Sequence, residues 1–143
     1  MMNRRDFLLS SCKACVATGG GLLLSSLFSS CSSLQVLKTT PSDNVIEVPK
    51  SSFAPEERKK IIRAVGVGYD ILLLLPAGKE PWAILMRCSH QDSALVALNR
   101  GFSCSMHGSQ FEDSGEVISG PATAPLKKFI VTQNETNYLI HLS

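Results

Sequence analysis

Two short motifs lie within the stretch Cys88-Ser-His-Gln-Asp-Ser-Ala-Leu-Val-Ala-Leu-Asn-Arg-Gly-Phe-Ser-Cys-Ser-Met-His107, and they decide how the rest of the sequence is interpreted. The first, C-x-H, places Cys88 two residues before His90. The second, C-x-x-H, places Cys104 three residues before His107, and fifteen residues separate the two cysteines. Beyond residue 31 the chain has no other cysteine and one other histidine, His141, which we expect at the surface or at a sheet edge. Thiolate and imidazole are common metal ligands, so the paired motifs predict a metal site built from two loops.

Three simpler interpretations of these residues remain open. A disulfide between Cys88 and Cys104 suits an exported protein but leaves both histidines without a role. Two structural cysteines with unrelated surface histidines would explain each half of the pattern separately. A zinc site has suitable ligand types, although zinc sites commonly group the cysteines in one arm and the histidines in the other. The interleaved order favours a two-iron cluster, in which Cys88 and Cys104 hold one iron while His90 and His107 hold the other.

The residues after the second motif extend this pattern. The segment His107-Gly-Ser-Gln-Phe-Glu112 is followed by Gly115-Glu-Val117, and then by Gly120-Pro-Ala122 and Pro125-Leu126. In this order they resemble the second cluster loop, the following turn and the proline loop of Rieske [2Fe-2S] proteins. The resemblance covers roughly residues 44–143, which we expect to form the Rieske [2Fe-2S] domain.

The resemblance implies a cofactor and assigns its ligands. It implies one [2Fe-2S] cluster per chain and no catalytic residue. Cys88 and Cys104 would ligate the buried iron, and His90 and His107 would ligate the iron near the tip. Pro121 would lie in the loop that covers the cluster.

Two departures from the family pattern concern the surroundings of the cluster. Rieske subunits of quinol-oxidising cytochrome complexes have an additional cysteine in each loop, and these form a disulfide; Ser93 and Met106 stand at those positions here. Those subunits also have a Ser and a Tyr whose hydroxyls bond to sulfur; Ser109 matches the first, but Phe111 replaces the Tyr. We therefore expect a potential in the lower half of the Rieske range of about −150 to +300 mV. Gly108 is expected to allow a tight turn where a side chain would crowd the cluster.

Short β-branched runs separated by turn residues fill the chain from Asn44 onward. Six runs fit strands, at residues 45–48, 61–67, 69–75, 82–86, 129–132 and 138–142. They predict an all-β fold, and the resemblance specifies a small Rieske-type antiparallel β-sandwich with two cluster-binding loops at one tip. Residues 55–60 begin with Pro and have acidic residues before basic ones, so we expect a short helical turn there.

The first 31 residues have the order of an export signal. Arg4 and Arg5 precede an apolar stretch, and Arg-Arg-Asp-Phe-Leu resembles a twin-arginine signal. Small residues before Cys31 resemble a lipoprotein cleavage box, in which that cysteine receives the lipid. An uncleaved anchor is the alternative, although its apolar run of about 12 to 15 residues is shorter than the roughly 18 to 20 that a spanning helix needs. Residues 32–43 are rich in hydroxyl groups and are predicted to form a flexible tether.

The charged residues are divided unevenly along the chain. Three of the 14 Lys and Arg residues and one of the 12 Asp and Glu residues lie in the first 31 positions. The rest of the chain therefore has 11 basic and 11 acidic side chains, and its formal net charge is zero. A neutral body lacks the concentrated basic face that binds nucleic acid through its phosphates. A body of about 100 residues also has no room for a large catalytic domain beside a cofactor module.

Together these features predict a one-electron carrier of the cell envelope, associated with the membrane through its N-terminal segment or a lipid on Cys31. It would carry electrons between a redox protein or a membrane quinol-oxidising complex and an acceptor. The alternative is a ferredoxin-like protein that donates electrons to an oxygenase or another oxidoreductase. A structural zinc module is the third possible function. The catalytic subunit of a ring oxygenase is excluded, because its mononuclear iron needs two further histidines and only His141 remains.

Overall fold

Eleven strands and one short 3₁₀ turn make up the part of the chain that the structure, a computed structural model, describes: residues 34–143. Seven of the strands are β1 (Val36–Thr39), β2 (Val45–Pro49), β3 (Lys59–Ala64), β4 (Ile71–Leu74), β5 (Trp82–Leu85), β10 (Lys128–Gln133) and β11 (Asn137–His141). The other four are β6 (Val96–Ala97), β7 (Phe102–Ser103), β8 (Gln110–Phe111) and β9 (Val117–Ser119). The predicted all-β class is therefore confirmed.

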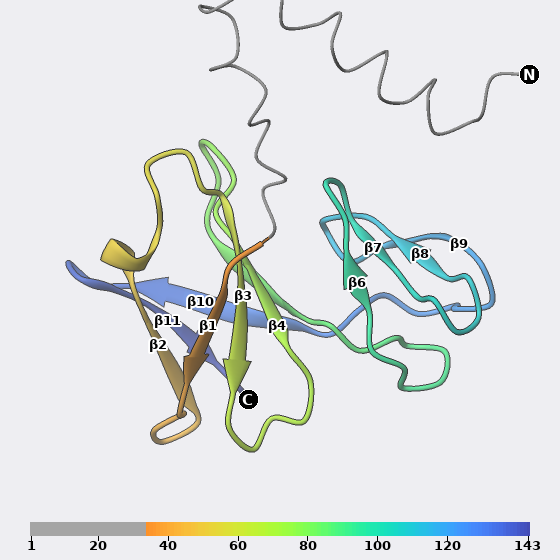
Figure 1. The fold of residues 1–143 in the computed structure, drawn as a ribbon, viewed down its shortest axis with the longest axis horizontal. Coiled ribbons are helices and arrows are strands. Elements are labelled where there is room, and N and C mark those ends of the chain that lie inside the picture. The colour runs from red at the N-terminus through yellow and green to blue at the C-terminus, as the bar shows by residue number, and fades with distance from the viewer. Residues whose placement is uncertain (1–33) are drawn as a thin grey trace, which may run out of the picture. The chain divides into compact units, whose positions relative to one another are not determined.

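The strands form two sheets. The large sheet has the order β1-β3-β4-β5-β10-β11-β2, and the small sheet has the order β6-β7-β8-β9 (Figure 1). Every pair within these sheets is antiparallel except β1 with β3. Each of the six predicted runs overlaps a strand of the large sheet. Within residues 34–143, no helix is long and apolar enough to span a membrane.

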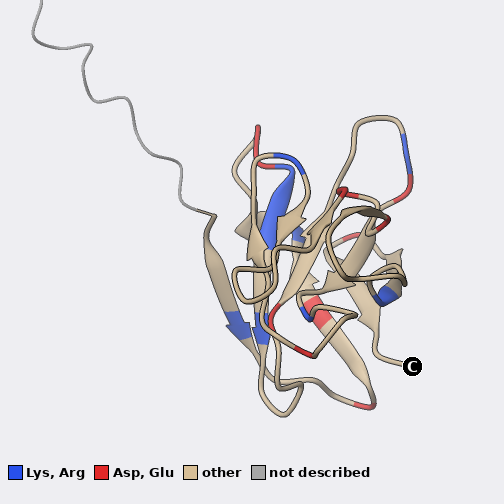
Figure 2. Cartoon of the chain, turned by 90° about the vertical axis from the view of Figure 1, so that its right-hand side faces the viewer, with Lys and Arg blue, Asp and Glu red and all other residues tan. Residues whose placement is uncertain are grey.

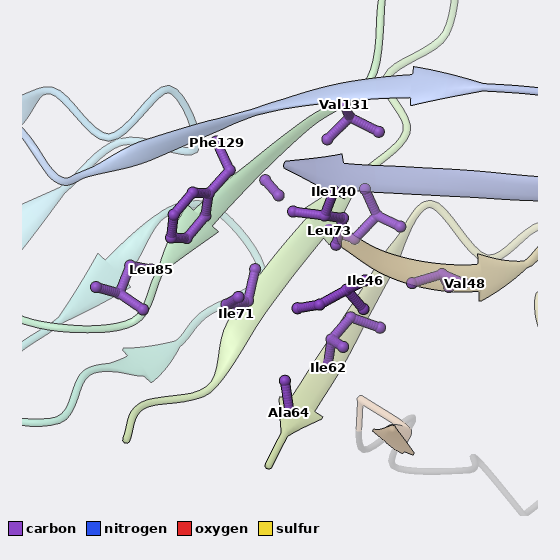
Figure 3. Packing of buried hydrophobic residues seen from close by; sticks show 11 residues of the cluster. Ile46, Val48, Ile62, Ala64, Ile71, Leu73, Leu85, Phe129, Val131 and Ile140 are labelled. Atoms are coloured by element: carbon purple, nitrogen blue, oxygen red, sulfur yellow. The ribbon is translucent and has the colours of Figure 1, made fainter. Parts of the chain in front are cut away.

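Strands β4 and β5 separate two hydrophobic cores, which explains why β4 is buried along its whole length. Because side chains alternate across a strand, Ile71 and Leu73 point into the core of the large sheet (Figure 3). Leu72 and Leu74 point the other way, into a second core that also contains Phe111 of the small sheet. Both cysteines of the predicted metal site belong to this second core, so the packing of the two sheets and the placement of the site are linked.

Strand β1 lies inside the segment 32–43, which we expected to form a flexible tether. Its register with β3 pairs Val36 with Ile61 and Thr39 with Ala64, and Leu37 packs against the core of the large sheet. The expectation is therefore wrong for residues 36–39. The sequence did not indicate this strand, because the two apolar residues Val36 and Leu37 are adjacent and show no alternation. The predicted export signal, residues 1–31, lies outside the described residues.

Residues 55–60, where we expected a short helical turn, form no helix, although one turn closes there with a hydrogen bond from the Glu57 N–H to the Ala54 carbonyl at 2.9 Å. The 3₁₀ turn lies earlier, at Lys50–Ser52, and Lys60 already belongs to β3. The strand directs the Lys60 side chain inward, where it is 2% exposed. Its Nζ donates to the Ser52 carbonyl at 2.6 Å and pairs with Glu57 at 2.9 Å. These partners and the pairing of β3 with β4 outweigh the weak helical preference of the segment.

The small sheet is not among the predicted runs. Its strands have two or three residues, too few to show an alternating pattern. Phe102 and Phe111 pair across β7 and β8 and are buried in the second core. This pairing fixes the hairpin that carries the second Cys–His motif.

Candidate metal centre

Three loops hold the residues of the predicted metal site. Loop 1, residues 86–95, follows β5 of the large sheet and contains the first motif. Loop 2, residues 104–109, joins β7 to β8 of the small sheet and contains the second motif. The proline loop, residues 120–126, lies between β9 and β10. Loop 2 and the proline loop contain no charged residue, whereas basic and acidic residues are interspersed over the rest of the described chain (Figure 2).

Loops 1 and 2 close with the same backbone hydrogen bonds. In each, the cysteine N–H donates to the carbonyl five residues later, and the N–H four residues later donates back to the cysteine carbonyl. The distances are 2.8 Å for Cys88 to Ser93, 3.0 Å for Asp92 to Cys88, 2.8 Å for Cys104 to Ser109 and 2.9 Å for Gly108 to Cys104. The residue before the serine has a positive φ in both, 50° at Asp92 and 78° at Gly108. The two motifs therefore form equivalent turns, in which Ser93 is the counterpart of Ser109.

The two cysteines lie on the inner side of these turns. Cys88 is 0% exposed and Cys104 1%, and neither forms a disulfide. Burial raises the pKa of the Cys104 thiol, but backbone N–H groups of His107 and Met106 and side-chain hydrogen bonds with Cys88 and Ser93 outweigh it, so the net pKa lies below its ordinary value. This favours the thiolate, which is the form that binds metal.

The two histidines lie on the outer side. The ring centroids of His90 and His107 are 5.0 Å apart and the rings are nearly perpendicular, at 85°. His107 is exposed and His90 is half-buried. The Nδ1 atom of His90 is buried and has no hydrogen-bond partner among the described residues. An unpartnered buried nitrogen is costly, and a bond to a metal would satisfy it.

These four side chains supply the donor types of a two-iron cluster. A [2Fe-2S] cluster needs two protein ligands at each iron, and the site offers a buried thiol pair and an outer imidazole pair. The third histidine lies elsewhere: His141 is on β11, between β10 and β2 rather than at an edge, with Nε2 2.9 Å from Thr132 Oγ1.

Two serines tie the proline loop to the cluster loops. The hydroxyl oxygen of Ser109 accepts a hydrogen bond from the Ala122 N–H at 3.2 Å, and the Ser89 hydroxyl donates to the Ala124 carbonyl at 2.5 Å. A Cβ at Gly120, where φ is 99°, would lie 2.5 Å from Ser109 Cα. At Gly108, where we expected a side chain to crowd the cluster, no protein atom lies within 4 Å of a Cβ, and the φ of 78° by itself favours glycine.

Loop 1 has a brace that the sequence did not reveal. Arg87 Nε donates to Asp92 Oδ1 at 2.7 Å, and the Tyr69 hydroxyl donates to the Asp92 carbonyl. The Arg87 guanidinium also lies over the Tyr69 ring, 5.8 Å from its centroid. Tyr69 precedes β4, so nothing in its position in the sequence places it beside loop 1. The acidic side chain at Asp92 thus takes part in the structure of the loop rather than in the ligand set.

Comparisons with known proteins agree with this geometry. The family model for the Rieske [2Fe-2S] domain matches residues 44–130. The cytochrome b6-f complex iron-sulfur subunit of Chlorobaculum thiosulfatiphilum is 28% identical over 86 residues, which are 59% of this chain and 46% of that protein. The chain therefore spans about half the length of the curated relative that it matches.

Solved structures share the fold at low sequence identity. The plasma membrane Rieske protein PetC3 from the cyanobacterium Synechocystis PCC 6803 matches with a TM-score of 0.55 and 18% identity, over 66% of this chain and 97% of that one. A chain from the complex of oxygenase and ferredoxin in carbazole 1,9a-dioxygenase matches with a TM-score of 0.52 and 20% identity, over 71% and 95%. Naphthalene 1,2-dioxygenase matches with a TM-score of 0.57 and 20% identity, over 70% of this chain but 26% of that one. At these identities the likeness concerns the fold alone.

Proposed function

This chain belongs to the Rieske [2Fe-2S] family, carries a [2Fe-2S] cluster and acts in electron transfer, and from this premise we propose that it is a one-electron carrier of the cell envelope. When bound, the cluster supplies the redox chemistry, by taking up and releasing one electron. The protein supplies the ligands, the hydrogen bonds to sulfur and the surface on which a partner docks.

The observation that carries the ligand assignment is the pairing of like donors. Cys88 and Cys104 lie together in the second core, and the rings of His90 and His107 lie 5.0 Å apart outside it. We assign the two thiolates to the buried iron and the two imidazoles to the outer iron. His107 is exposed, so the electron would leave or enter on the histidine side.

The proposed location rests on the N-terminal sequence. Arg4 and Arg5 resemble a twin-arginine signal, and such export carries proteins that are already folded around a cofactor. A lipid on Cys31 would then hold the domain at the membrane. Because β1 begins at Val36, we place the Rieske domain at residues 34–143, which leaves almost no tether after the proposed lipid site.

The curated relative and the loops support a proposal for the electron donor. One relative is a subunit of the cytochrome b6-f complex, which supports a membrane redox complex as partner. We expect a low potential because Phe111 offers no hydroxyl to sulfur, and this favours menaquinol or a flavoprotein over ubiquinol as donor.

A second candidate is a ferredoxin-like donor for an oxygenase or another oxidoreductase. Ser93 and Met106 replace the cysteines of the disulfide expected in quinol-oxidising subunits, and Met106 is 68% exposed beside His107. Copurification with the products of neighbouring genes distinguishes the two candidates, because a quinol-oxidising complex contains a membrane cytochrome and an oxygenase contains a mononuclear iron subunit.

Iron and acid-labile sulfide analysis of the purified protein tests the ligand set. Wild-type protein should contain two irons and two sulfides per chain, and the single variants Cys88→Ala, His90→Ala, Cys104→Ala and His107→Ala should lose the cluster and its visible spectrum. His141→Ala is the matched control, since it removes the third histidine of the domain, and it should keep both. A Cys88→Ala protein with normal iron and sulfide would refute the assignment, and zinc in a colourless wild-type protein would favour the structural zinc module.

The location is tested separately by fractionation. Changing Arg4 and Arg5 to Lys should leave folded, iron-loaded protein in the cytoplasm. Cys31→Ser should release the domain from the membrane fraction with its cluster intact. Unchanged membrane retention of the Cys31→Ser protein would indicate an uncleaved anchor instead of a lipid.

A further inference from the structure

The two cluster loops start from different sheets. Loop 1 leaves β5 of the large sheet and ends at β6 of the small sheet, whereas loop 2 connects β7 and β8, which both belong to the small sheet. The relative positions of the four proposed ligands therefore depend on the separation and angle of the two sheets. Hydrophobic contacts in the second core are non-directional, so directional polar contacts between the sheets constrain that angle further.

A polar node joins the two sheets at one place. The Asp113 carboxylate accepts hydrogen bonds at Oδ1 from Lys59 Nζ at 2.6 Å and from the Gly101 N–H at 2.8 Å. The Asp113 carbonyl accepts a hydrogen bond from Trp82 Nε1 at 3.1 Å. Lys59 Nζ also donates to the Asn99 carbonyl at 2.8 Å. Two residues of the large sheet thus hold three residues that flank the hairpin β7–β8.

The node lies at the base of both arms that carry the cluster loops. Trp82 is the first residue of β5, the strand that leads into Cys88. Gly101 comes directly before β7, the strand that leads into Cys104, and Asp113 comes two residues after β8. Both arms start at the node and end at the proposed cluster. A change of angle at the node therefore displaces loop 1, with Cys88 and His90, relative to loop 2, with Cys104 and His107.

The node is more constrained than an ordinary surface ion pair. The side chains of Lys59 and Asp113 are 20% and 35% exposed, and each has a second partner besides the other. Gly101 is buried, so its N–H needs an acceptor, and the Asp113 carboxylate is the one provided. The pair Arg63–Asp70 has a similar N–O distance of 2.7 Å but is more exposed at the arginine, 57%, and within residues 34–143 its two side chains hydrogen-bond only to each other.

We propose that Lys59 and Asp113 are positioning residues, which set the separation of the two cluster loops and thereby control how firmly the cluster is held. This inference rests on the proposed ligand set. It assigns no contact with the cluster to either residue: they act through the two arms. Outer residues that orient metal ligands commonly affect metal affinity by about 10- to 100-fold, and we expect an effect in the lower part of that range.

The test compares this pair with its exposed counterpart in the full-length, iron-loaded protein. The variants Lys59→Met and Asp113→Asn are measured beside the controls Arg63→Met and Asp70→Asn. Three quantities are recorded: the rate of cluster loss to an iron chelator, the EPR g-values of the reduced protein, and the denaturant midpoint of unfolding. Asp113→Asn keeps an acceptor for Gly101, so it is expected to fold, and Lys59→Met leaves the carboxylate in place.

The expected result is cluster loss about tenfold faster in Lys59→Met and Asp113→Asn, with shifted g-values. The two control variants should lower the unfolding midpoint without changing the g-values or the rate of loss. Lys59→Arg, which restores a donor to Asp113, should recover most of the wild-type rate. If the wild type holds a cluster but the node variants match the control variants in the rate of cluster loss and in g-values, the positioning role is overturned. A wild type without any cluster would instead overturn the proposed function.

Discussion

The Ser109 hydroxyl oxygen accepts a hydrogen bond from the Ala122 N–H at 3.2 Å, and the Ser109 side chain is fully buried. This bond uses a lone pair of the oxygen, so the hydroxyl hydrogen remains free to donate to sulfur of the cluster. One residue therefore links loop 2 to the proline loop and also offers a donor to the cofactor. Donation to sulfur stabilises the reduced form, which carries more negative charge.

Ser109→Ala should accordingly lower the reduction potential. A net contribution of about 0.5–1.5 kcal/mol for one hydrogen bond corresponds to about 20–60 mV for a one-electron couple. Protein-film voltammetry measures the shift. Ser114→Ala is the control, because that hydroxyl bonds to Glu112 in an exposed turn and should leave the potential unchanged. An unchanged potential in Ser109→Ala would mean that the hydroxyl serves the proline loop alone.

Ser93 is expected to act as a second hydroxyl donor. It is the loop 1 counterpart of Ser109, and its side chain contributes to lowering the pKa of the Cys104 thiol. Ser93→Ala should lower the potential by less than Ser109→Ala, since the Ser93 hydroxyl donates to the Gln91 carbonyl at 3.3 Å and its single hydrogen is then shared between that carbonyl and sulfur. Voltammetry of the exposed loop 2 variant Ser105→Ala gives the baseline. A shift larger than that of Ser109→Ala would contradict the order of the two donors.

Phe111→Tyr should raise the potential by supplying the missing phenol, again by about 20–60 mV. Phe111 is 0% exposed in the second core together with Cys104, so its new hydroxyl either finds sulfur or remains unpaired at a cost of about 1–3 kcal/mol. Phe102→Tyr is a matched control, since Phe102 is 1% exposed, lies in the same core and pairs with Phe111. Equal potentials for the two variants, with a large loss of stability in both, would show that the phenol does not reach the cluster.

Local patterns in the sequence were sufficient to propose the ligands and to predict most of the large sheet. The Cys–His motifs need no long-range information, and a strand such as β10 is indicated by the four consecutive residues 129–132, which all have a strong β preference. The small sheet could not be predicted in this way, because Gln110–Phe111 is too short to show alternation. It is a strand because Phe111 pairs with Phe102 and is buried against the large sheet.

The supports of the site depend on contacts between distant residues. Lys59 and Asp113 are 54 positions apart, and Ser89 and Ala124 are 35 apart, so no local window contains either pair. The short motif of loop 1 also does not reveal that Asp92 takes a positive φ or that Tyr69 braces it. Such features follow from the tertiary structure, and the sequence therefore identified the proposed ligands but not what holds them in place.

Gly120→Ala should destabilise the protein more than Gly108→Ala, although both glycines have a positive φ, 99° and 78°. At Gly108 only backbone strain opposes the change, about 1–3 kcal/mol, because no protein atom lies within 4 Å of the new Cβ. At Gly120 the Cβ would lie 2.5 Å from Ser109 Cα and 2.9 Å from Ser109 N, so overpacking adds about another 1–3 kcal/mol and displaces the proline loop.

Chemical denaturation gives the stabilities of the Gly120→Ala and Gly108→Ala proteins, and iron content separates the two causes. Gly120→Ala should lose stability with or without iron, whereas a side chain at Gly108 that crowds the cluster would reduce iron content while leaving the iron-free protein only mildly destabilised. Equal stabilities for the two variants would mean that the proline loop moves freely away from Ser109, and the link through Ala122 would then be too weak to hold that loop over the cluster.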